Sequence, residues 1–300
     1  MRRAIILATT LAVALLLWLW LSGGFSALAG WAAGEQREFQ NGIARTLRAL
    51  RGGEAGAYAL LMGSCFAYGF FHAIGPGHGK LLVGGYGMAR SVPVLRLSII
   101  ALLSSLGQAV TAIVLAYGGL WLLGLTRAAM VDTAEDWLAP FSYAMIAAIG
   151  LWLVWRGLRR LTTAQATQGH NHNGAPDEAC SSCGHRHGPS IEETQSATSL
   201  RDALLLIAGI AVRPCTGALF VLIITWQMGI ATAGIAGAFA MALGTASVTV
   251  SVGIAATGLR GGMLRSLAGA GALHWVMPAL ELAAGLVVVV LSGTLLLRAL

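Results

Sequence analysis

Long apolar stretches separated by short polar breaks dominate the pattern along this chain. The first stretch covers 4–21, and six more follow near 57–75, 97–125, 137–158, 200–227, 231–259 and 276–297. A helix of about 20 apolar residues crosses a hydrocarbon core of roughly 30 Å. No alternating strand pattern appears, so we predict an all-α polytopic membrane helix bundle with six core transmembrane helices and an N-terminal hydrophobic helix.

The N-terminal 55 residues divide into two predicted segments. Residues 1–31 form a signal or anchor helix, because an apolar run follows Arg2-Arg3 and ends near the small residues Ala27 and Ala29. Whether this helix is cleaved is left open. Residues 32–55 carry mixed charge, and we expect an amphipathic helix on the periplasmic membrane surface. Its apolar positions recur at helical spacing: Phe39, Ile43, Leu47 and Leu50.

Composition and charge fit the same class of protein. The chain is 57% hydrophobic and 10% charged, with 40 glycines that suit close helix packing. An ordinary soluble domain is roughly 25% charged, so a water-soluble core is excluded. The net charge of +7 lies mainly in the breaks. We therefore attribute it to membrane orientation and contact with the lipid bilayer, and expect no nucleic-acid binding.

The distribution of Lys and Arg predicts the orientation in a bacterial inner membrane. The breaks at 80–96, 156–160 and 260–265 are basic and belong in the cytoplasm by the positive-inside rule. The break at 126–136 is acidic and the turn near Met228 is uncharged, so both face the periplasm. This orientation makes the long polar loop at 161–199 cytoplasmic.

That loop divides the core into two predicted three-helix halves, 56–160 and 200–300. Two halves with an odd number of spans have opposite orientations, as in inverted-repeat transporters. Each half opens with a span broken at a proline: Gly75-Pro76-Gly77 in the first and Arg213-Pro214-Cys215 in the second. Paired interrupted helices indicate a binding site near the membrane midplane. The oligomeric state is left open.

The motif His72-Ala73-Ile74-Gly75-Pro76-Gly77-His78-Gly79-Lys80 carries the clearest chemistry. We place it at the cytoplasmic side of the first core span. Glycine and proline free backbone carbonyls there, so His72 and His78 can converge on one cation. Cys65 lies two turns earlier on the same helix face, as a softer ligand or a small packing residue. Imidazole suits Ni²⁺, Co²⁺, Zn²⁺ and copper; the alternative is a hydrogen-bonded core histidine.

The second half offers residues for a transport path or gate. Arg213 lies inside a span, where a charge costs roughly 2.5–3.5 kcal/mol, and Glu281 in the last span is its predicted partner. This pair is either a structural lock or a gate. Pro214, Cys215, Thr245 and, in the first half, Gln108 are further candidates to line the path, although helix packing explains small polar residues equally well.

The loop at 161–199 is a candidate for metal capture or sensing. Two HxH pairs surround a CxxC and supply imidazole and thiolate donors for Zn²⁺, Ni²⁺ or Co²⁺. These donors are His170, His172, Cys180, Cys183, His185 and His187.

The segments HAIGPGHGK, RPCTGA and GTASVT resemble those of the NicO family of nickel/cobalt exporters, from about Leu47 to the C-terminus. The resemblance implies six core spans, a His-rich cytoplasmic loop, and efflux of Ni²⁺ and Co²⁺ with His72 and His78 at the matching positions. Such a protein is no enzyme and holds no permanent cofactor; its cargo is Ni²⁺ or Co²⁺, possibly Zn²⁺. Metal loading of imidazole releases protons, so exchange with protons is expected.

Two alternatives are kept. The first is a nickel uptake permease, because related permeases with an early histidine motif import the metal. The second is a membrane thiol-redox protein that uses Cys180 and Cys183, with Cys65 and Cys215 as a relay.

Overall fold

The computed structural model describes residues 21–74, 78–90, 92–122, 124, 126–166, 200–267 and 273–299, and every regular element in these ranges is a helix. The all-α prediction is therefore confirmed. The elements, with η marking π-helical segments, are α2 (Gly24–Arg51), α3 (Ala57–Ile74), α4 (His78–Ala89), α5 (Val94–Ile113), η1 (Val114–Gly118), α6 (Gly119–Leu122), α7 (Arg127–Asp132), η2 (Thr133–Leu138), α8 (Ala139–Ala166), α10 (Leu200–Ala211), α11 (Thr216–Gln227), α12 (Ala231–Leu267) and α13 (Leu273–Ala299).

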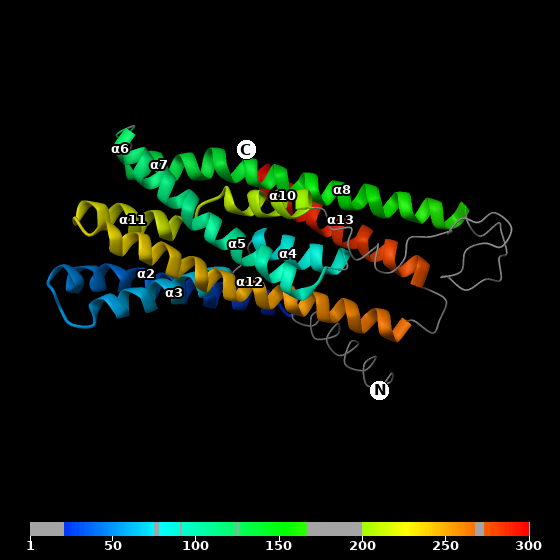
Figure 1. Cartoon of the computed structure of the whole chain (residues 1–300), viewed down its shortest axis with the longest axis horizontal. Helices are drawn as coiled ribbons and strands as arrows, with labels where there is room; N and C mark the ends of the chain where they lie inside the picture. Colours follow the sequence, from blue (N-terminus) through cyan, green and yellow to red (C-terminus); the bar gives the residue numbers. More distant parts are fainter. Residues whose placement is uncertain are drawn as a thin grey trace.

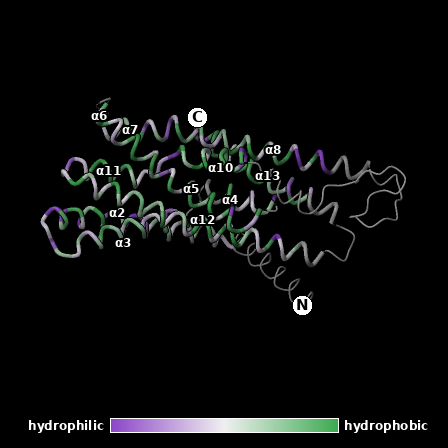
Figure 2. Tube along the Cα trace, in the orientation of Figure 1, coloured by the Kyte–Doolittle hydropathy of each residue, from purple (hydrophilic) through white to green (hydrophobic). Residues whose placement is uncertain are grey.

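The helices form an elongated bundle whose longest members lie along a common direction (Figure 1). Five of the described helices or continuous helical stretches are long and apolar enough to cross a membrane. The pair α10 and α11, bent by 60° at its break, makes a sixth if it counts as one span. Hydrophobic residues line most of the bundle's length (Figure 2). A polytopic membrane bundle is confirmed, while the exact number of six spans and the inverted halves stay predictions.

The helices α3 and α4 follow one another along α12. A side chain added at Gly69 in α3 would strike the Met241 backbone of α12, and one added at Gly244 would strike the Phe66 carbonyl. Further along, Gly84 of α4 lies against Val252. Residue numbers rise together along α12 and along the two helices beside it, so both α3 and α4 run parallel to α12.

This arrangement corrects the predicted position of the histidine motif. We placed the motif at the cytoplasmic side of the first span, but the 12-residue helix α4 begins within the motif and continues past it to Ala89. Leu82, Val83 and Tyr86 of α4 are buried in the core. The end of α3 and the start of α4 therefore lie part-way along the bundle, beside the middle of α12. Because glycine is unfavourable in a helix interior, the glycine-rich sequence of α4 did not predict a helix.

The pairing of helices in the second half mirrors that in the first. The path α10–α11 runs parallel to α5, since Gly107 contacts Ala211 and Tyr117 contacts Trp226. The long helices α8 and α13 pack against each other. The helices α3 and α4 thus lie beside α12 of the second half, and α10 and α11 lie beside α5 of the first half. This exchange of partners is compatible with the predicted inverted halves.

Helix α2 packs along α3 as part of the bundle. Its predicted apolar positions do share a face, with Ile43 and Leu47 fully buried and the Phe39 ring stacked on Phe71 at 5.4 Å. Gly53 and Gly56, both at positive φ, turn the chain between the two helices. Two expectations are corrected: the apolar face covers α3 instead of a membrane surface, and the predicted boundary at 31/32 falls inside a continuous helix.

The connections gather at the two ends of the bundle as the charge pattern predicts. The α2–α3 and α11–α12 turns lie at the same end as α6 and α7, and the ends of α8 and α12 lie at the other (Figure 1). The predicted break at 126–136 is shorter than expected, because α7, η2 and α8 make residues 127–166 continuously helical. Its acidic residues therefore lie in helix, Asp132 in α7 and Glu135 and Asp136 in η2.

Replacement of Gly69 by alanine should destabilise the fold. A Cβ at Gly69 would lie 2.0 Å from the Met241 carbonyl oxygen, so α3 and α12 must move apart. Overpacking of this kind costs about 1–3 kcal/mol. Gly63 in the same helix has nothing within 4 Å of its added Cβ, and Gly63→Ala should be neutral or stabilising. Unfolding in mixed detergent micelles measures both; equal stability of the two variants would contradict the packing.

Candidate functional site

Three functional side chains lie on one face of α3. Cys65, Tyr68 and His72 are spaced by three and four residues, which brings them to the same side of a helix. The Cys65 and Tyr68 side chains are buried, whereas His72 is exposed. The His72 ring lies parallel to the Tyr68 ring with centroids 6.1 Å apart. The face therefore leads from the packed core to a more open position just before the interruption.

This face of α3 meets the start of α11. A Cβ at Gly217 would lie 2.2 Å from the Tyr68 ring, so the ring packs directly on the α11 backbone. Cys215 is the N-cap residue of α11 and lies within electrostatic range of Cys65 and Tyr68. The predicted donors of the first half are thus beside the break of the second half.

The break between α10 and α11 leaves carbonyl oxygens without helical partners, and side chains of other helices satisfy them. Gln108 Nε2 donates to the Ile210 oxygen at 3.2 Å, and Thr111 Oγ1 donates to the Ala211 oxygen at 2.8 Å. Ser142 Oγ of α8 donates to the Gly209 oxygen at 2.6 Å. Because a membrane interior offers no water to do this, these side chains are what permits the break.

Helix α12 completes the centre. Thr245 Oγ1 donates across the helix interface to the Gly69 carbonyl oxygen at 3.2 Å. A small cavity joins α5, α11 and α12 at this level. The predicted path residues Gln108, Cys215 and Thr245 all line it. The structure therefore brings together candidates that lie far apart in the sequence.

The remaining predicted residues, both metal ligands and residues of the transport path, lie in parts of the chain that the structure does not describe. These are Gly75, Pro76 and Gly77 of the interruption, the side chains of His78 and Lys80 at the start of α4, and the loop residues His170, His172, Cys180, Cys183, His185 and His187. Their predicted roles stay predictions.

Among the described side chains, no three His, Cys, Asp or Glu residues gather as a metal site would require. Cys65 and Cys215 lie at one level, and His72 lies two helical turns from Cys65 along α3. These three side chains offer a metal cation successive donors along one line. Conduction requires several weak sites of this kind, because a cation held by a closed cage would not leave.

The predicted pairing of Arg213 with Glu281 is wrong. Arg213 Nη2 lies 3.0 Å from Glu135 Oε2, and its other terminal nitrogen donates to the Tyr143 hydroxyl. The side chain of Glu135 is 44% exposed, so this pair lies toward the surface at the α7 end of the bundle. Pro214 is buried next to it. Arg213 thus anchors the break to α8 and η2.

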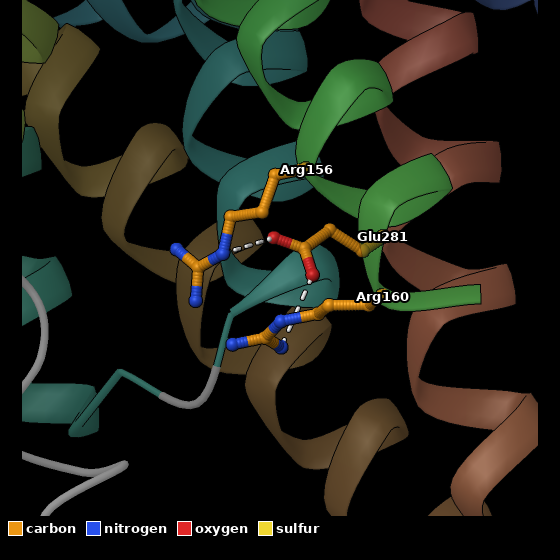
Figure 3. A network of polar contacts seen from close by, with 3 residues as sticks. All are labelled: Arg156, Arg160 and Glu281. Atoms are coloured by element: carbon orange, nitrogen blue, oxygen red, sulfur yellow. Dashed lines mark hydrogen bonds and ion pairs between the residues drawn. The ribbon is translucent and has the colours of Figure 1, made fainter. Parts of the chain in front are cut away.

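Glu281 binds arginines of α8 instead. Its side chain is 1% exposed, and its two oxygens lie 3.2 Å from Arg156 Nε and 3.2 Å from Arg160 Nη1 (Figure 3). Arg90 and Arg260 also interact electrostatically with this carboxylate. The only acidic side chain of α13 therefore lies in a strongly basic surrounding, away from Arg213.

The sequence analysis missed several residues of the centre. Tyr68 lies between Cys65 and His72 at helical spacing, so the same periodicity could have identified it. Glu135 lies in the acidic break that precedes a span, but nothing in the sequence distinguishes it from its neighbour Asp136. Thr111 and Ser142 cap the break through contacts that only the fold creates, and no sequence signal marks them.

The fold and this centre define a class: a polytopic membrane protein in which the break between α10 and α11 lies beside α3 at a polar site, as in the broken helices of secondary transporters. A family model confirms the class. The chain belongs to the NicO family, whose model is described as a high-affinity nickel-transport protein and matches residues 58–177 and 170–300. The family is one of metal transporters rather than enzymes, and the matches support transport of nickel or cobalt cations by this protein.

Individual relatives carry related names. A Haemophilus influenzae protein with the provisional name nickel/cobalt efflux system is 30% identical over 235 residues, which cover 74% of this chain and 71% of the relative. The nickel/cobalt efflux system RcnA of Salmonella paratyphi B is 24% identical over 229 residues, 64% of this chain and 78% of the relative. No solved structure matches the chain.

Replacement of Glu281 by glutamine should destabilise the protein far more than the same change at Glu135. Loss of a buried charge costs about 3–5 kcal/mol when the opposite charges stay buried, as those of Arg90 and Arg260 do near this carboxylate. An exposed pair contributes less than about 1 kcal/mol. Unfolding free energies of Glu281→Gln and Glu135→Gln in mixed micelles test this ranking, and a larger loss at Glu135 would refute it.

Proposed function

We propose that this protein exports Ni²⁺ and Co²⁺ from the cytoplasm across the inner membrane, along the line where the two interrupted helices meet. The proposal rests on one observation above all: the Cys65, Tyr68 and His72 face of α3 lies against Cys215 at the start of α11. The names of the relatives support efflux.

The donors of this line suit the proposed cargo. Imidazole and thiolate favour nickel, cobalt and zinc over magnesium and calcium. His72 and His78 flank the interruption at 75–77, whose backbone carbonyls can add oxygen ligands. The metal is a passing substrate in this scheme, and no ion is held permanently.

Proton exchange supplies the driving force in this proposal. Imidazole and thiol groups bind metal only after losing a proton, so loading and protonation exclude each other at each donor. A cation that leaves on the periplasmic side is then replaced by protons that return inward. The loop at 161–199 lies in the cytoplasm and delivers metal to the path.

Cells that lack their own exporter should accumulate less nickel and cobalt when they express the wild-type chain. The variant His72→Ala/His78→Ala should lose at least about tenfold of the export rate, since both imidazoles flanking the interruption are gone. His274→Ala, outside the motif, is the matched control. Metal content at equal protein levels is the measurement. A rise in content with the wild-type chain would instead establish uptake.

Purified protein in vesicles should move nickel several-fold faster when protons can flow in the opposite direction. The rate is followed with a metal-sensitive dye inside vesicles of set internal and external pH. Collapse of the pH gradient with a proton–potassium exchanger should remove the acceleration. An unchanged rate would exclude proton exchange while leaving nickel transport intact.

Substitution of all six loop donors by serine should raise the nickel concentration needed for half-maximal transport and leave the maximal rate within about twofold, because capture precedes the path. The variant Cys180→Ser/Cys183→Ser alone should keep most activity. Complete loss of function in that double variant would favour the thiol-redox alternative.

A further inference from the structure

Four arginines surround a single carboxylate at the end of the bundle where α4, α8, α12 and α13 come together. Arg156 and Arg160 of α8 take the two oxygens of Glu281. Arg90, directly after α4, and Arg260 of α12 also interact with this carboxylate. Among the residues that the structure describes, positive charge is therefore concentrated around Glu281.

Two of these arginines are deeply placed for charged residues. Arg90 is 5% exposed and Arg260 is 8% exposed. Arg90 is held in part by the Trp152 ring, whose centroid lies 5.4 Å from the guanidinium carbon. Asp202 is also near, because the Tyr86 and Trp152 rings that Arg90 faces line a neighbouring cavity together with Asp202. Two guanidinium groups buried side by side favour a bound anion.

Arg90 and Arg260 both line one open cavity of about 350 Å³ between α4, α12 and the α4–α5 turn. A water molecule occupies roughly 30 Å³ of liquid, so the cavity has room for a phosphate group with several waters. Its other lining residues are Gly87, Val92, Pro93, Thr257 and Gly261. The glycines leave the approach to the guanidinium groups unobstructed, and Arg is the side chain best matched to phosphate geometry.

We propose that this cavity binds a phosphate-bearing anion, either the headgroup of an anionic lipid or free phosphate, between Arg90 and Arg260. Basic pockets between transmembrane helices on the cytoplasmic side commonly bind lipid headgroups. The bound anion joins α4 to α12. This site is distinct from the metal path and does not depend on the proposed direction of transport.

The test uses the full-length chain, stripped of lipid in a non-ionic detergent, with phosphatidylglycerol, phosphatidylcholine and inorganic phosphate as probes. Binding is measured by native mass spectrometry and by the shift in melting temperature. Phosphatidylglycerol should bind the wild-type chain more tightly than phosphatidylcholine. Inorganic phosphate that binds and competes with it identifies free phosphate as a ligand; phosphate that does neither identifies the lipid headgroup.

The variant Arg90→Gln/Arg260→Gln should bind the preferred probe about 25-fold more weakly than wild type, and Arg260→Gln alone about fivefold more weakly. If the double variant does not fold, the binding of the probe by Arg260→Gln alone tests the proposed site. Arg159→Gln is the control, because Arg159 lies exposed on α8 over Trp155, outside the cavity. Equal binding by Arg260→Gln and Arg159→Gln, or no preference of the wild type for either anion over phosphatidylcholine, would overturn the site.

Discussion

Backbone groups inside a membrane must find hydrogen-bond partners within the protein, and the structure of this chain depends on how it meets that constraint at its helix breaks. The carbonyls of Gly209, Ile210 and Ala211 at the end of α10 receive hydrogen bonds from Ser142, Gln108 and Thr111. Away from that break, Thr245 of α12 donates to the Gly69 carbonyl within α3. Side chains of α5 and α8 therefore replace the helical bonds that the α10–α11 break removes.

The same contacts create the polar centre. Because the capping side chains come from neighbouring helices, the α10–α11 break is fixed against α5 and α8. Glycines allow the close approach: Gly217 accommodates the Tyr68 ring, and Gly237 lies against the Cys65 sulfur. A line of soft and imidazole donors results without a closed metal cage among the described residues. Donors that are distributed along a line suit the transport of a metal cation better than its storage.

Much of this could be predicted from local sequence, and the remainder depends on tertiary contacts. Apolar length identified the spans, and proline identified the α10–α11 break, because both effects act within one helix. Periodicity placed Cys65 and His72 on one face. It could not show that α4 is a helix, since its glycines and single lysine resemble a polar break. Nor could it pair Arg213 with Glu135, because the choice between Glu135 and Glu281 depends on how α8 and α13 pack.

The most direct test of a metal path between the interrupted helices is the reactivity of Cys215. With Cys65, Cys180 and Cys183 replaced by serine in a variant that still transports, Cys215 is the only thiol in the chain. Its rate of modification by a water-soluble methanethiosulfonate is measured in vesicles. The account predicts that Ni²⁺ or Co²⁺ slows the reaction several-fold and that Mg²⁺ does not, because imidazole and thiol donors select transition metals. A rate that Ni²⁺ leaves unchanged, or a thiol that is unreactive from both sides while transport continues, would contradict it.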